Sequence, residues 1–306
     1  MTSLGAADPS HLFLTFDVAI PDVGSAALLF EEWLHEVMPI LDQRCYEVAC
    51  EAPELITFRP PRLPVPIRGE PNGAWIAAWV RGEGVGGGSR SFAASQQALL
   101  AHFKTMQVGE TLLMDFRAMG ADGYPAGLGR SGFMDFGLEP SAGAGVVARL
   151  WVRTEYWERL FAGMHVVKDL VDDYRVLRGC GGIREDVFAE QWASTFGQDE
   201  DDVRGRTDVV TTYNWITLVS ASLTAEIADG RLVSGRQTLA ECDVLTSGAL
   251  WLKATADPRD YGPRAAAVVE VLDAVLPEGK PAPSWIPQAY APLVTDEIEE
   301  VSDGIV

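Results

Sequence analysis

Hydrophobic and polar positions follow two different periods along this chain. In HLFLTFDVAI (11–20), apolar and polar residues partly alternate and β-forming residues dominate, which is typical of a strand. In SAALLFEEWLHEVMPIL (25–41), apolar residues recur at helical spacing, and Asp22 or Ser25 can cap the helix. The apolar positions of this predicted helix are Leu28, Leu29, Trp33, Val37 and Ile40.

The same two periods recur further along the chain. Patterns rich in β-formers predict strands over 73–80, 110–119, 131–140 and 146–157, the last of them running into a helix. Helices are predicted over 90–106 and 158–177, followed by a GCGG loop and a helix over 185–196. YNWITLVS, SASLTAEI, GALWLKATAD and PRAAAVVEVLDAVLP then predict strand, helix, strand and helix between 213 and 277.

Mixed strands and helices without strict alternation favour an α+β fold with a mixed, mostly antiparallel sheet and flanking helices. We expect a single domain over 1–280 and a proline-rich, acidic tail over 281–306. Two segments resemble each other in outline: GAWIAAW and GALWLKAT are each followed by a loop and an alanine-rich helix. This similarity is compatible with a domain made of two similar halves, 1–145 and 146–280. A chance match is the favoured explanation of this similarity, because strand, loop and helix often follow one another in mixed folds.

Net charge narrows the kind of partner that the protein can bind. The chain has 44 Asp and Glu against 24 Lys and Arg, a formal charge of −20. Such a surface repels nucleic acid and anionic lipid and attracts basic partners. No basic and apolar leader and no apolar run of about 18 residues occurs, so we expect a cytoplasmic protein. The four scattered cysteines are expected to be reduced and mostly buried.

Motifs for catalysis, cofactors and metals are weak. Gly82, Gly84 and Gly87 fit GxGxxG in the glycine-rich loop 82–88, but no acidic residue follows at the distance that a ribose contact needs. A flexible loop is therefore favoured over a nucleotide site. No GxSxG motif and no metal-type histidine pair occurs, and His165 is expected to be a satisfied, partly buried histidine. We expect no enzyme activity, no cofactor and no metal.

One acidic run is a candidate partner-binding site. Its residues are Asp199, Glu200, Asp201 and Asp202, within the polar loop 198–208. A solvated loop is the ordinary explanation for such a run. The functional explanation is a docking patch whose charge steers a basic partner into place.

The last third of the chain resembles a known family. The order NWITLVSASL, a variable loop, GALWLKATADPRDYGP and RAAAVVEVLDAVLP resembles immunity proteins of bacterial type VI secretion and polymorphic toxin systems. The upstream segment RLWVRTEYWERLFAGMHVVKDLVDD is compatible with the middle of such proteins. The resemblance implies a protein that does no chemistry and neutralises a cognate toxin by binding it. The alternatives are a small-molecule or nucleotide-binding enzyme using loop 82–88, or a structural protein of a phage or secretion machine.

Overall fold

The structure is a computed structural model that describes residues 11–40, 43, 46–47, 74–82, 92–93, 100–101, 103–118, 121–122, 132–140, 146–154, 157–184, 208–210, 213–261, 264–276, 280–281 and 293–294. The chain divides into two compact units. The N-terminal unit is His11–Tyr174, and the C-terminal unit begins at Arg175. Each unit has its own strands, helices and buried residues.

The N-terminal unit is organised around an antiparallel sheet. Its strands lie in the order β3-β2-β4-β5-β6-β1, and each neighbouring pair is antiparallel. The central pairs are long and regular, with β1 matching β6 from Leu12 opposite Thr154 to Ile20 opposite Val146. The strands are β1 (His11–Ile20), β2 (Ala74–Gly82), β3 (Phe92–Ala93), β4 (Glu110–Ala118), β5 (Gly132–Pro140) and β6 (Val146–Thr154).

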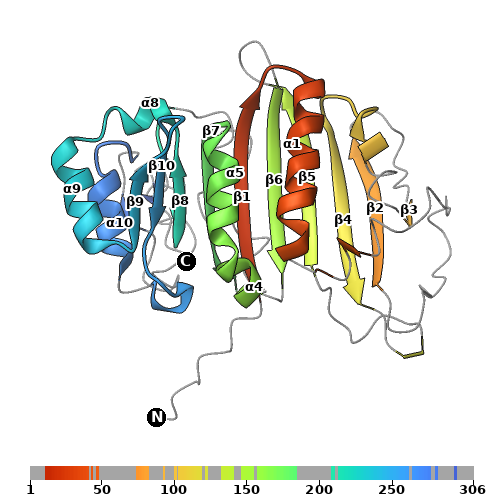
Figure 1. Ribbon diagram of the computed structural model, residues 1–306. Coiled ribbons are helices and arrows are strands. Elements are labelled where there is room, and N and C mark those ends of the chain that lie inside the picture. The colour runs from red at the N-terminus through yellow and green to blue at the C-terminus, as the bar shows by residue number, and fades with distance from the viewer. Residues whose placement is uncertain are drawn as a thin grey trace, which may run out of the picture. The chain divides into compact units, whose positions relative to one another are not determined.

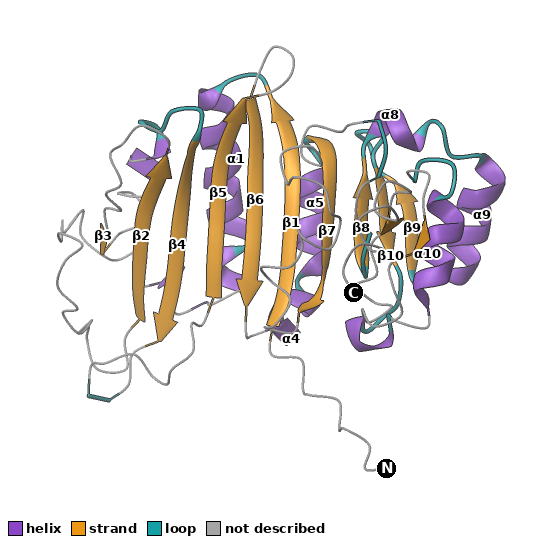
Figure 2. Ribbon diagram, turned by 180° about the vertical axis from the view of Figure 1, so that it is seen from behind, coloured by secondary structure: helices purple, strands orange, loops and turns teal. Residues whose placement is uncertain are grey.

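Helices of this unit cover one face of the sheet. Figure 1 shows α1 (Val23–Glu36) and α5 (Met164–Asp172) in front of the strands, and Figure 2 shows both behind them. Alternate residues of β1 point to this covered face, where the Phe16 ring meets the Trp33 ring of α1 edge to face. A second aromatic group joins Phe30, Phe103 and Phe136. The β1 residues of this face are buried: Leu12, Leu14, Phe16, Val18 and Ile20.

The C-terminal unit contains a second run of antiparallel pairs. Its strands β7, β8, β10 and β9 lie side by side in that order. Trp251 of β10 and Trp215, which directly precedes β8, are fully buried. The elements are β7 (Arg175–Arg184), β8 (Ile216–Val219), α8 (Ala221–Thr224), α9 (Asp229–Thr238), β9 (Glu241–Val244), β10 (Leu250–Lys253), the 3-10 helix η2 (Pro258–Asp260) and α10 (Ala265–Leu272), with a small antiparallel pair β11 (Lys280–Pro281) and β12 (Leu293–Val294).

Helices α9 and α10 pack together in this unit, and arginines hold them in place. Arg231 of α9 forms an ion pair with Asp273, 2.7 Å from guanidinium nitrogen to carboxylate oxygen, and also donates to the Glu270 carbonyl. Arg236 of the same helix donates its Nε to the Cys242 carbonyl of β9 at 3.3 Å. Because β9 is the last strand in the order, this arginine covers an acceptor at a sheet edge.

Most of the predicted elements are confirmed, as is the α+β class. The strands over 11–20, 73–80, 110–119, 131–140 and 146–157 correspond to β1, β2, β4, β5 and β6. The predicted cap is also confirmed, since the Asp22 carboxylate accepts a hydrogen bond from the Ser25 backbone N–H at 2.7 Å. The elements predicted over 213–277 correspond to β8, α8, β10 and α10. The expectation of two similar halves stays a prediction.

Four predictions of local structure are wrong. The helix over 158–177 is instead two helices, α4 (Trp157–Ala162) and α5, that meet at Gly163, and from Arg175 the chain is strand β7. The predicted GCGG loop lies inside β7, where pairing with β8 overrides the local turn preference of glycine. The predicted helix over 90–106 starts too early, because Phe92–Ala93 pairs with β2. The variable loop before GALWLK contains α9 and β9.

Within the described part of the chain, none of the helices combines the length and apolar character that crossing a bilayer requires.

Candidate partner-binding surface

The outer side of α1 carries an exposed leucine and several carboxylates. Leu28, Glu32 and Glu36 are spaced four residues apart and therefore share one side of the helix. Leu28 is 62% exposed, and Glu32 and Glu36 are exposed as well. The opposite side of α1 is buried against the sheet: Ala26, Ala27, Leu29, Phe30, Trp33 and Leu34.

Helix α5 repeats this division between a buried and an acidic side. His165, Asp169 and Asp173 follow at intervals of four residues and are exposed. Asp172 lies beside them and is half-buried. The inner side consists of apolar residues that anchor the helix: Met164, Val167, Leu170 and Val171.

A tyrosine links the two helices. Tyr174, directly after α5, donates its hydroxyl hydrogen to the Glu32 carboxylate of α1. Burial, and then this bond to Glu32, raise the pKa of the Tyr174 phenol well above its usual value. The phenol therefore stays a hydrogen-bond donor at neutral pH and joins residues 142 positions apart in sequence.

Together these positions form a surface that we name the acidic helical face, defined as Leu28, Glu31, Glu32, Glu36, Asp169, Asp172 and Asp173. Lys168 is the one Lys or Arg within α1 and α5. Within the described residues, the carboxylates of Glu31, Glu36, Asp169 and Asp173 form no ion pair or hydrogen bond. Uncompensated carboxylates on a firmly packed pair of helices create a field that attracts a basic protein.

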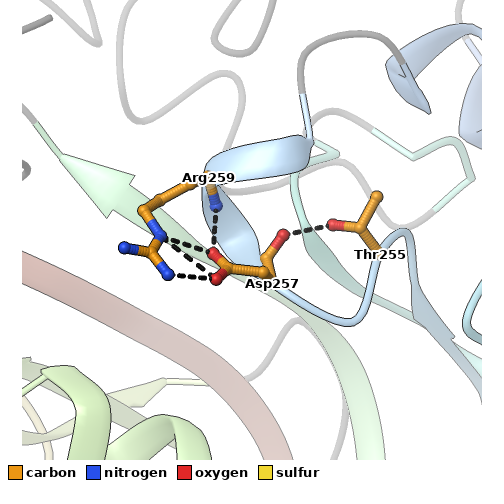
Figure 3. A network of polar contacts seen from close by, with 3 residues as sticks. All are labelled: Thr255, Asp257 and Arg259. Carbon is orange, nitrogen blue, oxygen red and sulfur yellow. Dashed lines mark hydrogen bonds and ion pairs between the residues drawn. The ribbon is translucent and has the colours of Figure 1, made fainter.

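A polar network shapes the turn after β10 in the C-terminal unit. Figure 3 shows the Asp257 carboxylate facing the Arg259 guanidinium, with Nε 2.9 Å from Oδ1. The Thr255 hydroxyl donates to the Asp257 carbonyl at 2.6 Å. The bond from Arg259 lowers the pKa of the Asp257 carboxyl below its usual value. Trp215 anchors this turn, because its Nε1 donates to the Thr255 carbonyl at 2.8 Å.

Several residues singled out in the sequence lie outside the described residues. The run Asp199, Glu200, Asp201 and Asp202 is among them, and so is the glycine-rich loop apart from Gly82, which ends β2. Docking on the acidic run and nucleotide binding at loop 82–88 therefore stay predictions.

The histidines with described side chains have ordinary local partners. Nδ1 of His35 lies 3.1 Å from the Tyr46 hydroxyl, and Nδ1 of His165 lies 3.2 Å from the Ala162 carbonyl. The prediction that His165 is satisfied is confirmed, but the side chain is exposed and not partly buried, because it lies on the outer side of α5. No group of three metal-ligating side chains occurs among the described residues.

Cys180 and Cys242 are buried free thiols, as expected. Burial raises the pKa of the Cys242 thiol, so it stays protonated at neutral pH.

The prediction for Leu28 is wrong, since it was placed on the apolar side of its helix. The signal that could have corrected it is present in the sequence, because Leu28 shares the four-residue spacing of Glu32 and Glu36. The buried residues Phe30, Trp33 and Leu34 mark the opposite side.

The fold defines an α+β protein, and α1 and α5 give its N-terminal unit an acidic surface. Neither protein-family models nor curated proteins match the chain. Among solved structures it is similar to "Pseudomonas aeruginosa T6SS protein PA0821". The identity is 14%, the TM-score is 0.52, and the match covers 98% of this chain and 83% of that one. At this identity the likeness concerns the fold.

Proposed function

We propose that the protein is an immunity protein of a type VI secretion system, which binds a cognate secreted toxin and blocks it. The observation that carries the proposal is the likeness in fold to a protein named as a type VI secretion protein, over 98% of this chain. The resemblance of the last third to immunity proteins of such systems supports the same function from the sequence.

The charge distribution supports binding of a basic toxin. The chain has a formal charge of −20, and the N-terminal unit concentrates carboxylates on α1 and α5. A basic toxin would be drawn to this surface from a distance, which speeds association and disfavours acidic competitors. Immunity of this kind works by stoichiometric complex formation in the cytoplasm and involves no turnover, cofactor or metal.

The first test uses the protein encoded beside this gene. That neighbour is expressed in bacterial cells alone and together with this chain, and growth is measured. We expect growth arrest by the neighbour alone, full growth with both, and a one-to-one complex by calorimetry of the purified pair. Continued arrest in the presence of folded, abundant protein would overturn the proposal.

A second candidate is a component of the secretion machine itself. The name of the similar protein gives the secretion system without a role, so it is compatible with this alternative. The two functions differ in what deletion of the gene does. Loss of an immunity protein exposes the cell to one toxin, whereas loss of a machine component stops secretion of every substrate.

A further inference from the structure

Leu28 is unusual among the apolar residues of the protein. Its exposed fraction is 62%, against 43–49% for the other large hydrophobic side chains that are exposed in the described residues, Val108, Val233 and Val244. An apolar side chain that is exposed to water does not gain the free energy that burial would provide. A leucine on the outer side of an anchored helix therefore has surface available to a partner.

Carboxylates surround Leu28 on the surface of α1. Glu31 and Glu32 follow it by three and four residues, so they are its neighbours on the surface of α1. Hot spots combine an apolar anchor with a polar rim that excludes water when the complex forms. The exposed leucine is an observation separate from the charge, and the two fall on the same face.

The acidic helical face is also held in shape before binding. Trp33 and Phe30 anchor α1, Val167 and Leu170 anchor α5, and Tyr174 bridges the two through Glu32. A preorganised surface loses less conformational entropy on association than a loop does. This favours the acidic helical face as a docking surface.

We infer that the acidic helical face is where the toxin docks, with Leu28 inserted into an apolar depression that lysines and arginines of the toxin surround. This inference rests on the proposed function and adds the contact surface and its chemistry to it. Leu28 would govern how long the complex lasts, because anchor contacts form after encounter. Glu36, Asp169 and Asp173 would govern how fast it forms, because charge acts at a distance.

The experiment measures association and dissociation rates of the toxin encoded by the neighbouring gene on immobilised variants. Leu28→Ala should raise the dissociation rate about tenfold or more, in the range of hot-spot truncations. Val233→Ala on α9, which also removes an exposed apolar side chain, is the matched control and should leave it unchanged.

A second pair of variants tests the charges. Combined Glu36→Gln, Asp169→Asn and Asp173→Asn should slow association severalfold and weaken its dependence on salt. Glu226→Gln, Asp229→Asn and Asp260→Asn remove the same charge from exposed positions of the C-terminal unit and serve as the control.

The outcomes separate the two claims. If the wild-type protein does not bind the toxin, the proposed function fails and this inference fails with it. If the wild type binds but the variants on α1 and α5 behave like their controls, the docking surface lies elsewhere and the immunity function stands.

Discussion

Two glycines of α9 differ in what surrounds them. A Cβ on Gly235 would lie 2.8 Å from the Cys242 sulfur and 2.9 Å from a Val271 methyl, whereas a Cβ on Gly230 would meet nothing within 4 Å. Contacts under 3 Å force neighbours apart, while alanine in open space removes only the conformational freedom of glycine in the unfolded chain. The two positions therefore predict opposite effects of one substitution.

We expect Gly235→Ala to lower the free energy of unfolding by about 1–3 kcal/mol, because overpacking a buried contact costs that much. Gly230→Ala should raise it by up to about 1 kcal/mol, because alanine favours helix over glycine. Urea unfolding of both variants measures the difference directly. Equal effects at the two sites would show that α9 packs on β9 and α10 more loosely than these distances imply.

Gly182 shows why residue-level prediction from sequence was incomplete. The pattern GCGG indicates a turn when read locally, but a Cβ at Gly182 would lie 2.2 Å from the Asn214 Oδ1. Asn214 is buried, and this same oxygen accepts the Trp215 backbone N–H at 2.7 Å. The side chain of Asn214, 32 positions later, therefore leaves room only for glycine at position 182. A local sequence pattern cannot show such a long-range contact.

At the scale of an element, the start of α1 depends on Asp22. The hydrogen bond from the Ser25 backbone N–H lowers the pKa of the Asp22 carboxyl. The pKa of Asp22 is therefore lower in the folded protein than in the unfolded chain. The Asp22 carboxylate then contributes its full stability above the unfolded pKa, about 3.9. That contribution is lost as pH falls through the folded pKa.

Replacing Asp22 tests this cap. Asp22→Ala should lower the urea midpoint at neutral pH, because the N–H of Ser25 loses its acceptor. Asp22→Asn keeps a neutral acceptor, so its stability should lack the acid-dependent loss that this carboxylate causes in the wild type. Midpoints measured at neutral pH and at about pH 3 compare the variants, and identical pH profiles for the wild type and Asp22→Asn would contradict the cap.

Elements whose apolar residues recur with a clear period could be predicted from the sequence, and elements without such a period could not. In strand β1 every second residue from Leu12 to Ile20 is apolar and buried, and this period of two is visible in HLFLTFDVAI. Helix α9, DGRLVSGRQT, contains two glycines and buries only Leu232 and Gly235, so it has almost no apolar stripe to detect. Its stability comes from contacts with β9 and α10, which are formed only in the folded chain.

At the scale of the whole molecule, two acidic regions compete for the role of docking patch. If the partner is the basic toxin proposed above, both the run Asp199–Asp202 and the acidic helical face would attract it, and this long-range attraction would fall as salt screens it. Neutralising all four residues of the run to Asn and Gln should slow association if the run is the patch. It should have little effect if the helical face is.

Association rates over a range of salt concentrations make the comparison. Truncation from Thr295 removes acidic residues of the tail and serves as a control for general charge, with a smaller expected effect. Should the toxin associate at a rate indifferent to salt, apolar contacts and not charge would determine binding.

The total charge was available from composition, but the grouping of carboxylates on α1 and α5 was not. The acidic helical face combines α1 with a helix that starts at Met164, and only the folding of the N-terminal unit brings them to one side of a sheet. Sequence reasoning selected Asp199–Asp202, because consecutive carboxylates are easy to see, and that choice stays a prediction. Carboxylates spaced four apart on two separate helices give a weaker signal in the sequence.

The arginine that covers β9 has a consequence for a cell that must store this protein. If the protein has the immunity function proposed above, it must be present before the toxin arrives, and unbound copies would then accumulate in the cell. Exposed strand edges are where such copies would stack into aggregates. Because Arg236 already donates to the Cys242 carbonyl, this acceptor is less available to the strand of another copy, which disfavours stacking at β9.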